Sequence, residues 1–384
     1  MQEFSKITIW HNILWSKYKG LVFSRLSDLA NRNGFSVSFF QIAETDTDRT
    51  LLSNVDTSYH SYKYKLLFKG SYGDVSRVKL IYILFRSVFD SNANLILLPG
   101  YHRVEYWAML FAAILKRKKR GVFCDSTIYD QSQSFVKGVL KRIFFSMCDG
   151  FFSYGERGRL YLIHYGAHPQ KIFQRCQAAA LPHDYSIVEA LVRRINLAPI
   201  QSAPRFLYVG RLSPEKSIDV LLSAFVKVRQ NLPTASLVLV GSGPQQKKLV
   251  ELTLALGLSD VVVFAGSMDA VALANEYAKA SCLVLPSFSE PWGLVVNEAL
   301  SYGCPVVVSH RCGCVPELVE NKPTGFVFKA GNVDELAERL VVVPAAFSDV
   351  EVTARHCLDL ISTFSPEAAA EEILKGCKQI LASY

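Results

Sequence analysis

The most constraining feature of this sequence is an alternation, present in both halves, of short apolar runs rich in β-branched residues with longer segments of helical period. Buried strands that alternate with helices are typical of parallel sheets covered by helices on both faces. The strands expected in the first half are Ile7–Leu14, Ser36–Ile42, Leu95–Leu98, Gly121–Cys124 and Gly150–Ser153, with helices at Leu21–Asn31 and Val104–Leu115. The strands expected in the second half are Arg205–Val209, Ser236–Val240, Val261–Phe264, Cys282–Leu285 and Pro305–Val308. The sequence therefore predicts an α/β fold with two Rossmann-like, doubly wound parallel-sheet domains.

The length of 384 residues also favours two domains, because single cores rarely grow this large. A stretch punctuated by Pro and Ser near the middle marks the junction. We expect an N-terminal domain over residues 1–185, a linker over 186–203, a C-terminal domain over 204–365 and a final helix over 366–384. Ligands of open parallel sheets bind beyond the carboxyl ends of the strands, so the two domains are expected to face each other across a ligand-binding cleft.

The composition is that of a packed globular protein, since half of the residues are hydrophobic and a fifth are charged. No apolar run reaches the roughly 18 to 20 residues that span a bilayer, and no secretory signal precedes the first strand. The nine cysteines are scattered through apolar runs, which indicates buried thiols in a reducing compartment. Cys312 and Cys314, the one close pair, lack a second pair at zinc-site spacing. We therefore expect a cytoplasmic protein without a metal site.

A formal net charge of +8 favours an anionic partner, such as nucleic acid, acidic lipid or a phosphorylated ligand. The densest cluster is Lys116–Arg120, five cationic residues in a row. An amphipathic stretch follows at Val136–Phe152, where Lys137, Lys141 and Arg142 accompany apolar residues. Together these segments indicate a surface for anionic lipid headgroups, with a solvated helix end as the alternative for the cationic run.

Two cations follow the first expected strand of the second half. The loop that starts at Gly210 carries Arg211 and Lys216, five residues apart, at the carboxyl end of that strand. A guanidinium and an ammonium in this position would bracket a diphosphate and stabilise the negative charge that develops on it as a glycosidic bond breaks. The alternatives are two cations that face solvent, or an Arg211–Glu215 pair.

Two acids flank a helix start further along the chain. The segment Phe288–Leu300 passes through a Pro-Trp-Gly bend before a helix that we expect to begin near Leu294. The backbone N–H groups of Gly293 and Leu294 would lie at the helix N-terminus, which suits a phosphate. Glu290 precedes this helix and Glu298 lies about one turn inside it, so both carboxylates can line one pocket and bind sugar hydroxyls. The alternative is one acid that interacts with the helix dipole and a second on a solvated face.

Glu290 and Glu298, with seven residues between them, together with Arg211 and Lys216, resemble the motif of the retaining glycosyltransferases of family 4, which have the two-domain GT-B fold. Further stretches that are similar to this family are Val240–Pro244, Val263–Ser267, Gly303–Val307 and Gly325–Val327. The resemblance runs nearly continuously from about residue 205 to residue 340.

The resemblance implies a role for each of these residues. Arg211 and Lys216 would hold the donor diphosphate. Glu290 would contact the transferred sugar, and Glu298 the ribose hydroxyls. The other donor-binding positions would be Gly210, Gly266, Ser267, Gly293 and Leu294, of which Gly266 and Ser267 would lie near the base. The resemblance further implies a UDP- or GDP-sugar donor, retention of configuration, no metal or other cofactor, and a final helix that crosses back to the first domain.

The first half resembles the family less closely. Relatives carry a Gly-Gly pair after the first strand, whereas this chain has Gly20 alone, which we expect to let the backbone approach the donor phosphate. Asp125 stands where relatives have a His or an acid. It would contact the transferred sugar or the acceptor hydroxyl, or else cap the turn that follows. His102 is a second candidate for the acceptor contact, with an ordinary surface His as the alternative.

These residues predict a retaining glycosyltransferase that transfers a hexose-type sugar to a hydroxyl of a saccharide or lipid-linked acceptor. We expect it to act in bacterial surface-polysaccharide or glycolipid assembly, on the inner face of the cell membrane, without a nucleic-acid partner. The alternatives are a sugar-nucleotide epimerase of the same architecture and a non-catalytic nucleotide-sugar binding module. Asp46-Thr47-Asp48 resembles the metal motif of the other glycosyltransferase fold but lacks framing hydrophobic strands. Gly241-Ser242-Gly243 lacks the third glycine of a dinucleotide-binding loop.

Overall fold

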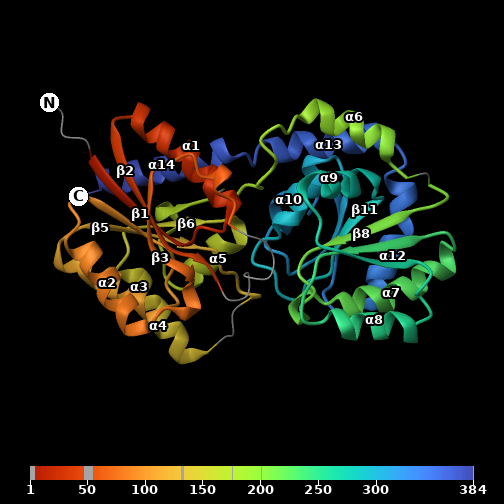
Figure 1. Ribbon diagram of the computed structural model, residues 1–384, viewed down its shortest axis with the longest axis horizontal. Helices are drawn as coiled ribbons and strands as arrows, with labels where there is room; N and C mark the ends of the chain where they lie inside the picture. Colours follow the sequence, from red (N-terminus) through yellow and green to blue (C-terminus); the bar gives the residue numbers. More distant parts are fainter. Residues whose placement is uncertain (1–4, 47–54, 131–133, 175, 200, 384) are drawn as a thin grey trace. The chain divides into compact units, whose positions relative to one another are not determined.

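The computed structural model describes residues 5–46, 55–130, 134–174, 176–199 and 201–383. The chain divides into two compact units (Figure 1), Met1–Ala180 with Ser365–Tyr384, and Leu181–Phe364. Each unit is built on one sheet whose described strand pairs are parallel. The predicted α/β class with two parallel sheets is confirmed.

The sheet of the first unit has seven strands in the order β3-β2-β1-β4-β5-β6-β7. Its strands are β1 Ser5–Ile13, β2 Phe35–Thr45, β3 Tyr64–Ser71, β4 Leu95–Leu98, β5 Lys119–Cys124, β6 Gly150–Ser153 and β7 Ile172–Phe173. Its helices are α1 Lys17–Arg32, α2 Arg77–Phe89, α3 Val104–Leu115, α4 Phe135–Ser146, α5 Glu156–His164 and α14 Pro366–Ala382. The strand order reverses between β1 and β4, so the loops after these strands open a crevice at the carboxyl edge.

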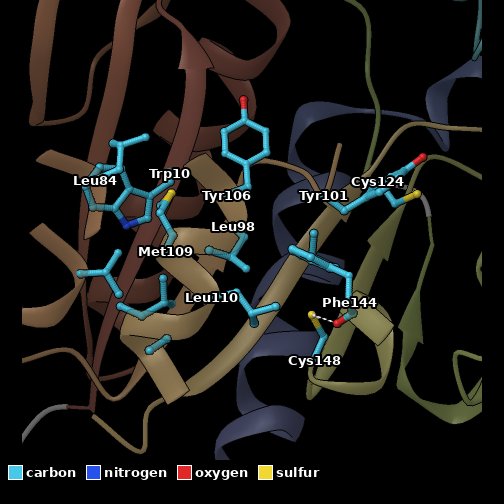
Figure 2. Close-up of a cluster of buried hydrophobic side chains, with 14 of the residues drawn as sticks. Trp10, Leu84, Leu98, Tyr101, Tyr106, Met109, Leu110, Cys124, Phe144 and Cys148 are labelled. Atoms are coloured by element: carbon cyan, nitrogen blue, oxygen red, sulfur yellow. Dashed lines mark hydrogen bonds between the residues drawn. The ribbon is translucent and has the colours of Figure 1, made fainter. Parts of the chain in front are cut away.

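Helices α2, α3 and α4 cover one face of this sheet, and α1 and α14 pack together on the other (Figure 1). The core under the first group is apolar and largely aromatic (Figure 2), with Trp10 from β1, Leu98 from β4, Met109 from α3 and Phe144 from α4. On the other face, α14 approaches the strands closely. A Cβ at Gly150 would lie 2.4 Å from the Cδ1 atom of Ile380, so a larger residue here would force the Ile380 side chain to move.

The sheet of the second unit has six strands in the order β10-β9-β8-β11-β12-β13. Its strands are β8 Arg205–Val209, β9 Ser236–Val240, β10 Val262–Gly266, β11 Cys282–Leu285, β12 Val306–Ser309 and β13 Gly325–Phe328. Its helices are α6 Ile187–Leu197, α7 Ile218–Asn231, α8 Gln246–Ala255, α9 Ala270–Lys279, α10 Leu294–Ser301, α11 Val315–Leu318, α12 Val333–Ala346 and α13 Val350–Ser362. The order reverses between β8 and β11, which makes the loops after these strands the natural ligand site.

The segment predicted as a linker, residues 186–203, is not a simple connection. It contains α6, whose N-cap Ser186 accepts a hydrogen bond from the backbone of Glu189. Helix α6 packs against α9 and α13. Buried Arg194 donates hydrogen bonds to the carbonyl oxygens of Ala278 (2.8 Å) and Ala280. These contacts make the helical part of the segment an integral part of the second unit.

No helix in the described part of the chain is long and apolar enough to cross a membrane. All nine cysteines lie in the described part, all are buried, and none forms a disulfide bond. Burial raises the pKa of several of these thiols, for example that of Cys304 to about 11. The cysteines therefore behave as small apolar core residues, as their positions in apolar runs predicted.

Candidate functional site

The loops at the carboxyl ends of β8, β9 and β10 are joined by backbone hydrogen bonds. Gly210 N donates to Val240 O (3.0 Å), and Gly241 N donates to Gly266 O (2.8 Å). Gly241 has a φ of +127°, and a Cβ there would lie 2.0 Å from the carbonyl oxygen of Gly210. Only glycine permits this approach. The predicted donor positions Gly210 and Gly266 thus belong to one continuous floor, and Ser267 follows at its exposed rim.

Lys216 and Glu290, which are 74 residues apart in the sequence, form an ion pair through Nζ and Oε2. The backbone brings them together, because Phe288 N donates to the carbonyl oxygen of Glu215 (2.9 Å) and docks the loop after β11 on the loop after β8. The two side chains are only 16% and 13% exposed. A pair this sheltered from water is weakly screened, so the two side chains attract each other more strongly than an exposed pair would.

Arg211 pairs with Glu215, with 2.8 Å between Nη2 and Oε1. Ser213 donates a second hydrogen bond to the same carboxylate (2.6 Å). Burial acts to raise the pKa of Glu215, but the Ser213 hydrogen bond and the nearby cations more than offset it, so the pKa is lowered. The Arg211–Glu215 pair, which the sequence left open as an alternative, is therefore present. An anion that binds Arg211 would compete with Glu215.

Helix α10 begins at Leu294, as predicted, with Gly293 as its N-cap. Gly293 has a φ of +102°, a conformation that strongly favours glycine. The loop before the helix is held from the side, because Gly313 N donates to Glu290 O (2.9 Å) and the Trp292 indole donates to Asn297 Oδ1 (2.8 Å). Glu290 and the first N–H groups of α10 thus lie on one supported loop, and Lys216 reaches Glu290 from the neighbouring loop after β8.

Glu298 lies one turn inside α10 and accepts a hydrogen bond from the hydroxyl of Tyr277 (2.8 Å). Burial raises the pKa of Glu298 to about 7, and the hydrogen bond from Tyr277 only partly opposes this effect. Tyr277 is itself held by stacking on Tyr302, with 5.7 Å between ring centres. Glu298 is therefore an acid that changes its charge near neutral pH.

Sequence reasoning did not single out Arg311, which follows β12 at the same edge of the sheet. Its guanidinium lies 3.8 Å from the ring centre of Phe288 and donates to the Phe288 carbonyl oxygen (3.4 Å). Arg311 thus supports the loop that carries Glu290. The sequence contains a sign of this role, because Arg311 follows a predicted strand as Arg211 does.

In the first unit, Asp125 follows directly after β5 and is exposed. The turn beyond it is held by Asp130, which accepts hydrogen bonds from the N–H (2.5 Å) and hydroxyl (2.9 Å) of Thr127. In the part of the chain that the structure describes, Asp125 itself has no hydrogen bond or ion pair. Partial desolvation lowers the pKa of His102, and the negative charge of Asp125 opposes this shift. The two acceptor-side candidates are therefore near neighbours at one edge of the first sheet.

Gly20 does not lie in a loop, and this prediction is wrong. Helix α1 begins at Lys17, and Gly20 is buried within its first turns. A Cβ at Gly20 would lie 2.8 Å from the carbonyl oxygen of Tyr59 and 2.9 Å from Nε2 of His60. The glycine makes room for this neighbouring segment, which accounts for its presence. Of the discounted acidic triplet, Thr47 and Asp48 lie outside the described residues.

The cationic run Lys116–Arg120 is not one solvated helix end, because it spans the end of α3 and the start of β5. Lys118 is buried and donates to the carbonyl oxygen of Ala93 (3.0 Å). The guanidinium of Arg120 donates two hydrogen bonds to Asp149, each 3.0 Å long. Both cations are therefore engaged inside the protein.

The stretch Val136–Phe152 is likewise amphipathic over only part of its length. Helix α4 ends at Ser146, and Gly150–Ser153 is the buried strand β6. Lys141 is buried, with Nζ 4.6 Å from the ring centre of Tyr165. The surface at which this stretch exposes both apolar and cationic side chains is thus confined to α4.

Residues 194–342 match the family model described as Glycosyl transferases group 1. The chain is 36% identical over 155 residues to the sulfoquinovosyl transferase SQD2 of Arabidopsis thaliana, a match that covers 40% of this chain and 28% of that protein. It is 30% identical over 236 residues to the D-inositol 3-phosphate glycosyltransferase of Rhodococcus opacus (strain B4), which covers 58% of this chain and 51% of that protein. The chain thus spans about half, or less, of the length of these relatives.

Two solved structures resemble the whole chain. The lipopolysaccharide outer core galactosyltransferase WaaB, in its apo form, has a TM-score of 0.72 and 15% identity, and the match covers 98% of this chain and 99% of that one. Anabaena Alr3699/HepE in complex with UDP and glucose has a TM-score of 0.69 and 17% identity, over 98% of this chain and 100% of that one. These structures define the fold. Residues 194–342 therefore belong to the glycosyl transferases group 1 family, and the chain has the two-sheet GT-B fold.

Proposed function

We propose that this protein is a retaining glycosyltransferase that moves a hexose-type sugar from a nucleoside-diphosphate sugar to a hydroxyl group. The observation that carries the proposal is the ion pair that Lys216, on the loop after β8, forms with Glu290, on the loop that leads into α10. This arrangement offers a cation and free N–H groups for a diphosphate and a carboxylate for a sugar hydroxyl. UDP is the favoured nucleotide, because the similar Anabaena protein was solved with UDP and glucose.

In this proposal, Lys216 and Arg211 bind the diphosphate and stabilise it as the leaving group, without a metal. To bind the diphosphate, Arg211 breaks its ion pair with Glu215. Glu290 accepts hydrogen bonds from the transferred sugar, and Glu298 accepts them from the ribose. Gly210 lines the donor site, Gly266 and Ser267 lie near the base, and Gly293 and Leu294 present N–H groups to phosphate. Asp125 and His102 in the first unit serve the transferred sugar or the acceptor hydroxyl.

A screen of UDP-, GDP-, ADP- and CMP-sugars by thermal shift and calorimetry tests this function. We expect one nucleotide class to bind and, with a panel of saccharide and lipid-linked acceptors, to yield a glycoside that keeps the donor's anomeric configuration. Conversion of the donor without an acceptor would identify an epimerase instead. Binding without turnover, unaffected by Glu290→Ala, would identify a binding module. Failure of all four classes to bind would refute the proposal.

The affinity for the nucleotide sugar is expected to fall as pH falls through 7. Ribose hydroxyls donate to the ionised form of Glu298, whose pKa is about 7, so protonation removes the better acceptor. The donor Kd should rise about tenfold between about pH 8 and pH 6. The diphosphate diester does not titrate in this range, so calorimetry with the intact nucleotide sugar isolates the effect.

Two variants check the assignment to Glu298. Glu298→Gln should weaken the donor affinity by about tenfold at pH 8 and make it independent of pH. Tyr277→Phe keeps the ring that stacks on Tyr302 but removes the hydrogen bond that lowers the Glu298 pKa. It should therefore move the midpoint to higher pH. A midpoint that stays in place in both variants would contradict the assignment.

We further propose that the acceptor is lipid-linked, in bacterial glycolipid or surface-polysaccharide assembly, and that α4 rests on the anionic inner face of the membrane. Helix α4 has two apolar faces. One packs in the core, and the other exposes Val136, Val139, Leu140 and Ile143, which recur at helical spacing and are 41% to 67% exposed. Exposed cations, Lys137 and Arg142, accompany them. Apolar side chains flanked by cations suit an anionic lipid surface.

The variant Leu140→Glu/Ile143→Glu should bind vesicles with a high content of anionic phospholipid at least about tenfold more weakly than the wild type, because it replaces apolar anchors with like charge. Co-sedimentation measures this. The matched control is Val250→Glu/Leu254→Glu on α8, which changes two exposed apolar residues about one helical turn apart and should bind as the wild type does. Wild-type binding that is insensitive to anionic lipid and salt would refute the membrane proposal.

A further inference from the structure

Tyr208 is a fully buried tyrosine near the carboxyl end of β8. Its hydroxyl donates a hydrogen bond to the carbonyl oxygen of Arg211 (2.8 Å), which also accepts one from the backbone N–H of Ser213 (3.0 Å). Burial raises the pKa of the Tyr208 hydroxyl well above its ordinary value, and the negative charges of Glu290 and Glu215 add to this effect. The hydroxyl therefore stays protonated at physiological pH and remains a hydrogen-bond donor to the loop that carries Arg211.

Gly210 leaves the space that this hydrogen bond needs. A Cβ atom at Gly210 would lie 2.9 Å from the hydroxyl oxygen of Tyr208 and 3.3 Å from the ring carbon that bears it. Because the ring is fully buried in a packed interior, it has little room to move away. A side chain at position 210 would thus push the hydroxyl away from the carbonyl oxygen of Arg211. The glycine before Arg211 therefore serves this contact as well as the floor of the site.

The peptide group that joins Arg211 to Leu212 is held at both ends. Its carbonyl oxygen accepts the hydrogen bond from Tyr208, and its N–H donates to the carbonyl oxygen of Ser242 (2.9 Å) in the loop after β9. The carbonyl oxygen of Leu212 in turn accepts a hydrogen bond from Gln245 N (2.9 Å). Since a peptide group is planar, contacts at both of its ends fix its orientation. The backbone at Arg211 therefore cannot rotate without the loss of a hydrogen bond.

The orientation of this peptide group matters for the binding of an anion. The carbonyl oxygen is the negative end of the peptide dipole, and it points at the buried hydroxyl of Tyr208. A rotated peptide would turn this oxygen toward the loops of the site, where it would repel a phosphate. The fixed backbone also gives the Arg211 side chain a constant base, from which it pairs with Glu215 at 2.8 Å.

We propose that Tyr208 is a positioning residue for the donor diphosphate, which acts through the backbone of Arg211. Its hydroxyl, in the space left by Gly210, keeps the carbonyl oxygen of Arg211 turned into the protein and the guanidinium on the side of the phosphates. The inference rests on the proposed function for the role of Arg211 toward the donor. The hold that Tyr208 has on the loop does not depend on that function.

Amide hydrogen exchange of the free protein, followed by NMR, tests whether Tyr208 holds the peptide group. Tyr208→Phe keeps the ring and removes the hydroxyl, so the Leu212 amide should exchange about fivefold faster. The amide of Gly241, which donates to Gly266 O in the neighbouring floor, should keep its wild-type rate. An unchanged rate at Leu212 overturns the proposal. Equal acceleration at both amides also overturns it, because the effect would then be a general loss of stability.

A double-mutant cycle tests whether Tyr208 acts through Arg211. Tyr208→Phe should weaken UDP binding about fivefold in the wild type, but less than about twofold in Arg211→Met, which has no guanidinium to position. The KM for the nucleotide sugar should rise, while the KM for the acceptor stays the same. The matched cycle combines Tyr208→Phe with Glu298→Gln. There the losses should add, because Glu298 lies on α10 and bonds to Tyr277 on α9.

The outcomes separate this proposal from the proposed function. If the wild type binds UDP and the losses of Tyr208→Phe and Arg211→Met add, Tyr208 does not act through Arg211 and the proposal is wrong. If the wild type binds none of the nucleotides, the proposed function fails, and the role of Tyr208 toward the donor fails with it. The exchange rate of Leu212 needs no nucleotide, so it decides in either case whether Tyr208 holds the loop.

Discussion

Lys216→Ala is expected to abolish measurable binding of the nucleotide sugar and to lower kcat/KM by about a thousandfold, or roughly 4 kcal/mol of transition-state stabilisation. Two effects combine. The variant removes a cation from the diphosphate, and it leaves the carboxylate of Glu290, which is 13% exposed, without its partner. An unpaired carboxylate in this place repels the phosphates and costs about 3 to 5 kcal/mol. Calorimetry with UDP and initial-rate kinetics measure the two losses separately.

Lys227→Ala is the matched control for this prediction. Lys227 lies on α7 in the same unit and also forms an ion pair, with Asp334, but its side chain is 49% exposed and that of Asp334 is 68% exposed. Exposed pairs of this kind contribute about 1 kcal/mol or less, and Lys227 lies outside the loops of the site. Donor binding and turnover should therefore match the wild type. A Lys216→Ala protein that folds and binds UDP within about threefold of the wild type would show that Lys216 does not hold the diphosphate.

The elements that the sequence predicted well are those whose signal is local. The strands β8, β9 and β11 have the predicted bounds, because each is a short, mostly apolar and largely buried run between polar loops. The elements that the sequence did not predict include an edge strand and the helix that follows it. The edge strand β3 is mostly only half-buried, so it lacks the continuous apolar run of a central strand. Helix α2 follows β3 and was missed with it.

For the candidate site, spacing along the chain predicted which residues matter but not how they pair. The bend before Leu294 and the helix after it are encoded within a dozen residues. The contact between Lys216 and Glu290 depends on the docking of two loops from different strands, and the contact between Tyr277 and Glu298 depends on the packing of α9 against α10. Residue types alone do not reveal such non-local contacts, and the burial that raises the pKa of Glu298 follows from the same packing.

The first unit shows most clearly how little the sequence alone reveals about the environment of each side chain. The run Lys116–Arg120 looked like one cationic surface because adjacent residues were counted together, yet a helix end and a strand start direct their side chains differently. Lys118 consequently caps carbonyl groups, while Arg120 binds Asp149.

Glu290→Ala is expected to impair the handling of the transferred sugar while it spares the binding of the nucleotide. Transfer should fall by about 10² to 10³, because the carboxylate that accepts hydrogen bonds from the transferred sugar is lost. The Kd for UDP alone should stay the same or improve, because Lys216 no longer shares its charge with a carboxylate and becomes fully available to the phosphates. Wild type and variant should therefore differ in their preference for the UDP-sugar over UDP, which competitive calorimetry measures.

Two further carboxylate variants decide whether this result is specific. Glu320→Gln changes an exposed acid of the same unit and should leave both transfer and UDP binding unaltered. Glu215→Gln removes the carboxylate that pairs with Arg211, so it should tighten UDP binding a fewfold without the loss of transfer seen for Glu290→Ala. If Glu290→Ala instead weakens UDP and the UDP-sugar equally, the main role of Glu290 is to position Lys216. The sugar contact would then have to come from another residue on the same loop.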